Sequence, residues 1–138
     1  MKKVFFSVSY KNKDHLSKEI LCMKKLLKKF SLKMNVFVSE YSFSPKQEKE
    51  MMKKALEEIE NSDFFIAEVS EKAIGVGIEM GFAKALKKPI LYLRNAGAEH
   101  STTASGISDF RIVYRDTEEL ESGLSEALTK LISQTRNT

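Results

Sequence analysis

Residues 63–83 read DFFIAEVSEKAIGVGIEMGFA, and this stretch decides the fold. The run 63–69 is short, and its first half is apolar on both faces, as in a strand that helices cover on each side. Glycines stand at 75 and 77, and a helical pattern follows over 76–87. The stretch therefore predicts a buried strand, a turn made by Gly75 and Gly77, and a helix with Glu79 in its first turn.

The same alternation of strand and helix extends in both directions from this stretch. Strands are predicted at 4–9, 35–39, 89–93 and 110–114, and residues 95–108 read as a loop. Asp14 is expected to cap the first helix, and Ser44-Pro45 to open the second. The residues expected to face the core are Leu16, Ile20, Met23, Leu27 and Phe30 in the first helix, Met52, Leu56 and Ile59 in the second, and Leu120, Leu124, Leu128 and Leu131 in the last.

Five strands that alternate with helices predict an α/β fold. The expected architecture is a three-layer, flavodoxin/Rossmann-like, doubly wound parallel sheet with strand order 2-1-3-4-5. In this topology ligands bind beyond the carboxyl ends of the strands, near strands one and three. The segments expected at that edge are 7–13, 39–44, 68–79 and 94–106. Neither a repeat nor a linker interrupts the 138 residues, so one domain is expected over 1–138.

Composition argues against several classes of protein. Apolar residues make up 42% and charged residues 30%, which is typical of a globular chain. No apolar run approaches the ~20 residues that span a bilayer. The first predicted strand begins at Val4, which leaves no room for a signal peptide, and the single cysteine, Cys22, excludes an internal disulfide. We therefore expect a cytoplasmic protein without a membrane partner.

Neither the distribution of charge nor the spacing of potential metal ligands indicates a specific binding site. The net charge is +4, and lysines at 24, 25, 28 and 29 lie on one amphipathic helix. They indicate a solvated helix face more than a nucleic-acid surface, because no aromatic stacking residues accompany them. His15 and His100 are far apart, and no Cys/His/Asp spacing indicates a metal site. Neither a metal nor a cofactor is expected.

Glu79 is the candidate chemical residue. The positive end of a helix dipole favours an ionised carboxylate, and an ionised carboxylate at the mouth of a cleft suits a nucleophile. Acidic residues in a first helical turn also simply stabilise the helix, so position alone leaves both interpretations open. The spacing G-x-G-x-x-x-G differs by one residue from the dinucleotide fingerprint, and the phosphate loop ending in Gly-Lys-Ser/Thr is absent.

Three segments, 63–70, 75–83 and 88–90, resemble the nucleoside 2-deoxyribosyltransferases, and most closely their branch of 2'-deoxynucleoside 5'-monophosphate N-hydrolases. The resemblance is dense from 62 to 93. It implies that Glu79 is a nucleophile that attacks C1' of the deoxyribose as the base leaves. Water or a second base then resolves the glycosyl–enzyme ester. The implied activity is cleavage or transfer of the N-glycosidic bond of a (deoxy)nucleoside or nucleoside 5'-monophosphate.

The resemblance also implies where the substrate binds. Ser9 and Lys11 match positions for phosphate recognition, with lysine where arginine is usual. Ser101 matches a serine that reaches across a dimer interface, so a homodimer is implied. The complete predicted substrate-binding set is Phe5, Ser7, Ser9, Lys11, Gly75, Gly77 and Ser101.

The sequence departs from the family pattern at three positions. Phe5 stands where the family has a tyrosine, Ala55 where it has an aspartate, and Ala73 where it has a polar residue. Glu48 or Glu58, two turns before and one turn after Ala55, are candidates to replace the aspartate. The departures keep a second function open: a catalytically impaired nucleotide-binding or sensor protein on the same fold. The sequence does not choose among the possible bases or between deoxyribose and ribose. It also leaves both a requirement for a 5'-phosphate and the choice between hydrolysis and transfer as alternatives.

Overall fold

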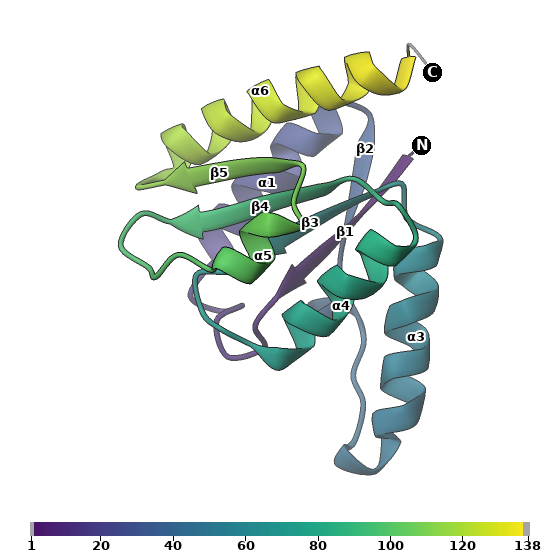
Figure 1. Cartoon of the computed structure of the whole chain (residues 1–138). Coiled ribbons are helices and arrows are strands. Elements are labelled where there is room, and N and C mark those ends of the chain that lie inside the picture. Colours follow the sequence, from purple (N-terminus) through teal and green to yellow (C-terminus); the bar gives the residue numbers. More distant parts are fainter. Residues whose placement is uncertain (1, 137–138) are drawn as a thin grey trace.

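A computed structural model of the chain describes residues 2–136 (Figure 1). Five strands form one parallel sheet in the order β2-β1-β3-β4-β5. The strands are β1 (Lys2–Val8), β2 (Leu32–Val36), β3 (Phe64–Glu68), β4 (Ile90–Asn95) and β5 (Phe110–Tyr114). The predicted fold class and strand order are confirmed.

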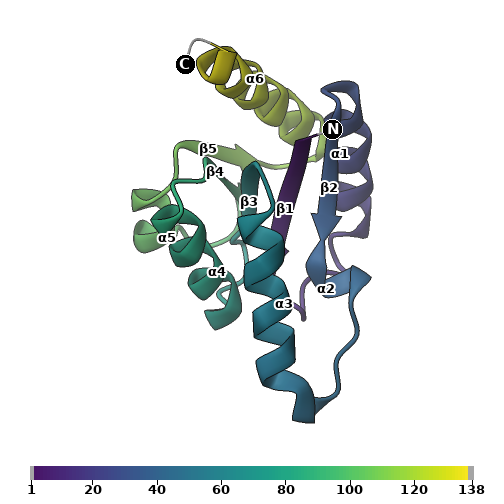
Figure 2. The ribbon, with the colours of Figure 1, turned by 90° about the vertical axis from the view of Figure 1, so that its right-hand side faces the viewer.

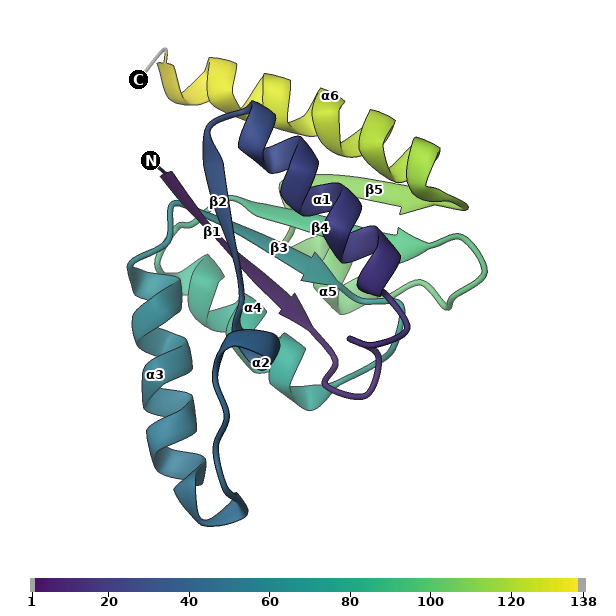
Figure 3. The ribbon, with the colours of Figure 1, turned by 180° about the vertical axis from the view of Figure 1, so that it is seen from behind.

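Helices cover both faces of the sheet. One face carries α1 (Ser17–Lys29) and α6 (Thr117–Arg136), which share one core; in Figure 3 α1 lies in front of the strands and α6 runs along the top. The other carries α3 (Glu48–Glu60), α4 (Ile74–Ala85) and the short α5 (Thr102–Gly106), and Figure 2 shows α4 and α1 on opposite sides of the sheet. The short helices α2 (Phe37–Glu40) and η1 (Pro45–Gln47) connect β2 to α3.

Alternating side chains of the strands build two cores. On β1, Val4 and Phe6 belong to the core under α1 and α6, whereas Phe5 belongs to the core under α3 and α4. All five residues of β3 are buried, as predicted for a strand covered on both sides. The second core includes Val76, Met80 and Ala83 of α4, and Val76 is the one nearest the carboxyl edge of the sheet.

The second strand lies earlier than predicted. It ends at Val36, and residues 37–40 form α2 instead of continuing the strand predicted at 35–39. The observed strand alternates buried Leu32 and Met34 with exposed or half-buried polar residues, a period of two that the apolar run 36–38 obscured. The short helix directs the ring of Phe37 against that of Phe5, with 5.9 Å between the ring centroids.

Several local predictions were also wrong. Asp14 does not cap α1: the N-cap is Leu16, without a side-chain cap, and Asp14 pairs with Lys13 at 3.0 Å. In α3 Ile59 is buried and Leu56 packs half-buried against the second core, as predicted, whereas Met52 lines the cleft described below and Ala55 is the other fully buried residue. The predicted loop 95–108 contains α5.

Candidate active site

A cleft of about 570 Å³ opens at the carboxyl edge of the sheet. Its wall is made by the last residue of β1 and residues 9–11 after it, the start of α2, one side of α3, residues 71–73 after β3, and the first two turns of α4. This volume lies within the ~300–1,000 Å³ typical of small-molecule sites. The cleft lies beside β1 and β3, where the topology predicted that ligands bind.

The Glu79 carboxylate lines this cleft and is held by β1. The Ser7 hydroxyl donates a hydrogen bond of 2.6 Å to Glu79 Oε1, and Ser7 itself is buried. Burial raises the pKa of Glu79, and the hydrogen bond from Ser7 opposes that rise. The other carboxylate oxygen of Glu79 makes no hydrogen bond within residues 2–136.

The sequence placed Glu79 wrongly within its helix. Helix α4 begins at Ile74, so Glu79 lies in the second turn and not in the first. The helix dipole acts mainly within the first turn, so it does not hold the carboxylate ionised as expected. Desolvation dominates instead, and the pKa of Glu79 moves in the direction opposite to the expected one.

The predicted glycine turn is also wrong. Gly75 and Gly77 lie inside the first turn of α4, and no glycine of residues 2–136 has a positive φ. A Cβ atom added at either position would meet nothing within 4 Å. Gly75 lines the cleft, so what these residues contribute is a helix start with bare backbone beside that space.

A second carboxylate, Glu71, lines the same cleft. The Ser9 hydroxyl donates a hydrogen bond of 2.7 Å to Glu71 Oε1, and Ser9 is buried. Glu71 was not among the site residues predicted from the sequence. It could have been noted as an acidic residue just beyond β3, within the segment 68–79 expected at the ligand-binding edge.

The remaining predicted residues are not all in the cleft. Lys11 lines it and is exposed. Phe5 is fully buried and stacks on Phe37 and Phe65, so it does not line the cleft. Ser101 caps α5 by accepting a 3.3 Å hydrogen bond from the Ala104 N–H.

Ser101 instead lines a neighbouring hollow of about 120 Å³. This hollow shares Glu71, Lys72, Ala73 and Val76 with the cleft, so the two spaces adjoin. The structure thus brings Ser7, Ser9, Lys11, Gly75 and Glu79 together, with Gly77 and Ser101 in the adjoining hollow.

Neither acidic candidate of α3 lines the cleft. Glu58 accepts hydrogen bonds from Asn35 Nδ2 at 2.7 Å and Tyr41 Oη at 3.2 Å. It also pairs with Lys54 at 3.2 Å, so its carboxylate is committed to structure. Glu48 is exposed at the first residue of α3. Ala55, between them, does line the cleft and gives it an apolar wall.

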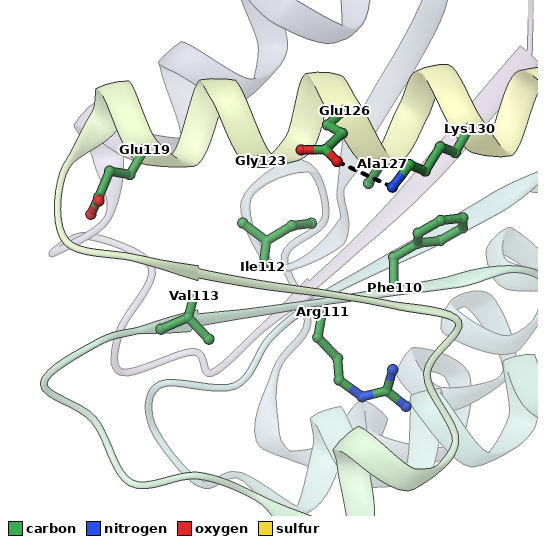
Figure 4. Close-up of a pocket in the computed structure, with 9 residues that line it drawn as sticks. All are labelled: Phe110, Arg111, Ile112, Val113, Glu119, Gly123, Glu126, Ala127 and Lys130. Carbon is green, nitrogen blue, oxygen red and sulfur yellow. Dashed lines mark hydrogen bonds and ion pairs between the residues drawn. The ribbon is translucent and has the colours of Figure 1, made fainter.

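Another hollow, of about 260 Å³, lies between β5 and α6 (Figure 4). Its charged groups already have partners: Glu126 pairs with Lys130 at 3.1 Å, and Arg111 donates to the Ser105 hydroxyl at 2.6 Å. In Figure 4 the Arg111 guanidinium points away from α6. The cleft around Glu79 is therefore the better candidate for chemistry.

Residues 2–136 contain neither a candidate metal-binding cluster nor a candidate membrane span. Within this range no three His, Cys, Asp or Glu side chains gather in a way that could hold a metal ion. The helices of the same range include none with the length and apolar character needed to cross a membrane.

The fold and the cleft define the class: a parallel α/β protein with a partly buried glutamate at the ligand-binding edge of its sheet. A sequence model of nucleoside 2-deoxyribosyltransferase matches residues 6–132, and the chain belongs to this family. A relative from Syntrophotalea carbinolica (strain DSM 2380 / NBRC 103641 / GraBd1), named "Putative 2'-deoxynucleoside 5'-phosphate N-hydrolase 1", is 46% identical over 46 residues. That match spans 33% of this chain and about a third, 32%, of the relative.

Solved structures share the fold at low sequence identity. The CMP N-glycosidase BcmB of Clostridium botulinum has a TM-score of 0.67 and 22% identity, covering 91% of this chain and 99% of that one. A 2-deoxyribosyltransferase of Bacillus psychrosaccharolyticus has a TM-score of 0.65 and 17% identity, covering 86% of this chain and 90% of that one. At these identities the two structures show that the fold is shared.

Proposed function

We propose that this chain cleaves or transfers the N-glycosidic bond of a nucleoside or nucleoside 5'-monophosphate, with Glu79 as the nucleophile. The observation that carries the proposal is the Glu79 carboxylate in the cleft, oriented by the Ser7 hydroxyl at 2.6 Å. The names of the relatives, a nucleotide N-hydrolase, a CMP N-glycosidase and a 2-deoxyribosyltransferase, agree on the bond that is attacked.

The reaction proceeds in two steps. The free oxygen of Glu79 forms a bond to C1' as the C1'–N bond breaks, and the electron pair of that bond leaves with the base. Water or a second base then attacks C1', and the Glu79 carboxylate is released. Ser7 acts as a positioning residue, because its hydrogen bond fixes one carboxylate oxygen and leaves the other for attack.

The cleft offers distinct surroundings for a phosphate and for a base. Helix α4 has no side-chain cap at its N-cap residue Ala73, so its first N–H groups can receive an anion. Lys11 supplies a positive charge on the same cleft. Phe37 and Met51 form an apolar wall suited to the base or sugar. A nucleoside 5'-monophosphate therefore fits these surroundings better than a free nucleoside.

We further propose that the protein works as a homodimer with α4 in the interface. Apart from Glu79 and Lys84, every residue of α4 is apolar or glycine. Ile74 is 84% exposed and Ile78 is 52% exposed, although the opposite side of the helix is buried in the core. A helix that is apolar all round is normally covered on both sides, and a second copy would cover it here.

One observation favours a second candidate function, binding without turnover. The cleft wall at Ala55 carries no carboxylate, where the family pattern has an aspartate. General acid–base catalysis typically accelerates a reaction about 10²–10⁴-fold. If no other group provides it, the protein binds a nucleotide and acts as a sensor, and Ala55→Asp should then create measurable base release.

The test is release of free base from a panel of ribo- and deoxyribonucleosides and their 5'-monophosphates, followed by chromatography. We expect release by the wild type and none by Glu79→Gln, because an amide cannot form the ester. Glu118→Gln, an exposed glutamate of α6, is the matched control and should behave as wild type. Turnover by Glu79→Gln would remove Glu79 from the nucleophile role.

A further inference from the structure

We propose that Glu71 is the acid–base residue of this cleft: it protonates the departing base and then takes a proton from the attacking water. This inference rests on the proposed function and adds a second carboxylate to the same site. Among the described residues that line the cleft, Glu71 and Glu79 carry the only carboxylates.

The geometry comes from two serines at the carboxyl end of β1. Ser7 lies on β1, and Ser9 directly follows its last residue, Val8. Both serines are buried. Ser7 donates to Glu79 at 2.6 Å and Ser9 to Glu71 at 2.7 Å. These two serines thus hold two carboxylates in one cleft, and paired carboxylates are the catalytic groups of most glycosidases.

The surroundings of Glu71 leave it available for proton transfer. The neighbouring Lys72 pairs with Glu99 at 3.2 Å, and the partner of Glu71 is a neutral hydroxyl. Glu71 also lines the adjoining hollow beside Ser101, so the residue borders both spaces. Glu58, the alternative on α3, is held by Asn35, Tyr41 and Lys54 instead.

The proton balance closes over the two steps. In the first, the Glu71 carboxylic acid gives its proton to the base nitrogen as the C1'–N bond breaks and Glu79 bonds to C1'. In the second, the Glu71 carboxylate takes a proton from water while the water oxygen bonds to C1' and the ester to Glu79 breaks. The products are the free base and the free sugar or sugar phosphate, and both carboxyl groups return to their starting states.

The experiment compares two substrates that differ in their need for a proton. 2'-Deoxyguanosine 5'-monophosphate releases a base that must be protonated, whereas its 7-methyl analogue already carries a positive charge on the base. Initial rates of base release are measured under single-turnover conditions for wild type, Glu71→Gln and the control Glu118→Gln, an exposed residue of α6 outside the cleft. Glutamine keeps an oxygen that can accept the Ser9 hydrogen bond, and thermal unfolding confirms an unchanged fold.

Glu71→Gln should lose at least about 100-fold with the ordinary nucleotide and less than about 10-fold with the 7-methyl analogue. In a separate multiple-turnover measurement, added azide should speed turnover of the analogue by the variant and give a glycosyl azide, because azide needs no deprotonation. An equal loss on both substrates, or no loss on either, would overturn the role of Glu71 while leaving the proposed function in place. Absence of release from both substrates by wild type would overturn both proposals.

Discussion

Burial and the Ser7 hydroxyl act on the Glu79 carboxyl in opposite directions, and burial has the larger effect on its pKa. The folded-state pKa of Glu79 lies above its ordinary value of 4.5. The stability that this shift contributes is therefore fully present below about pH 4.5 and is lost as pH rises through the raised pKa. At neutral pH the folded protein bears the cost of a partly buried charge.

Glu79→Gln should consequently gain stability relative to wild type as pH rises. We expect the difference in the free energy of unfolding to be small at pH 4 and to favour the variant increasingly from pH 5 to pH 8. Urea unfolding at each pH measures this, with Glu118→Gln as the exposed control. A difference that does not vary with pH would contradict the raised pKa.

The sequence could identify Glu79 but not its partners. Glu79 stood out because of the glycine motif around it and the family resemblance. Its hydrogen bond with Ser7 joins residues 72 positions apart, and that of Glu71 with Ser9 joins residues 62 positions apart. Such contacts follow from the packing of β1 beside the loop after β3, and local spacing holds no information about them.

At the scale of elements, the contact of α6 with β5 depends on Gly123. A Cβ atom there would lie 2.7 Å from Ile112 Cγ2, the branched side chain that Gly123 covers in Figure 4. Ile112 is buried and stiff at χ1, so it cannot yield easily. Although alanine favours helix by about 1 kcal/mol over glycine, overpacking costs about 1–3 kcal/mol.

We therefore expect Gly123→Ala to lower the free energy of unfolding by up to about 2 kcal/mol. The matched control is Gly81→Ala in α4, where an added Cβ meets nothing within 4 Å. That control should raise the free energy of unfolding by about 0.5–1 kcal/mol. Denaturant unfolding of both variants decides the matter, and a stabilised Gly123→Ala would show that the helix can move away from β5.

Element positions were predictable where periodicity was plain. The strands at 4–9 and 63–69 overlap β1 and β3 closely, since apolar runs bounded by polar residues mark them. Strand β2 was predicted too late in the sequence. The first turn of α4 was missed because the glycines at 75 and 77 are typical of a turn, whereas in the structure they are helical. Tertiary contacts of the first turn override the low helix propensity of glycine.

At the scale of the whole molecule, the exposed apolar face of α4 predicts self-association. Ile78→Glu places a charge on that face, which a second copy of the chain would cover in the proposed dimer. We expect the wild type to have the mass of a dimer by light scattering and Ile78→Glu to have that of a monomer. Leu21→Glu, at an exposed leucine of α1, is the control and should remain dimeric. A monomeric wild type would reject the interface.

The arrangement of the whole molecule was the most predictable level. Strand–helix alternation with right-handed crossovers leaves few topologies, and the observed order matches the expected one. That topology also located the cleft beyond β1 and β3, before any side-chain contact was known. What it could not supply is the composition of the cleft wall, which α2 and α3 determine through Phe37, Met51 and Ala55.

The central claim is that Glu79 forms a covalent bond to C1', and trapping that ester tests it most directly. A nucleotide whose sugar carries fluorine at C2' in the arabino configuration should react slowly, because fluorine destabilises the oxocarbenium-like transition state, and the ester should accumulate. Mass spectrometry of the intact protein and of its proteolytic peptides should find one added sugar phosphate, on the peptide that contains Glu79. An adduct on another residue, or base release from the ordinary nucleotide with no adduct at Glu79, would contradict the account.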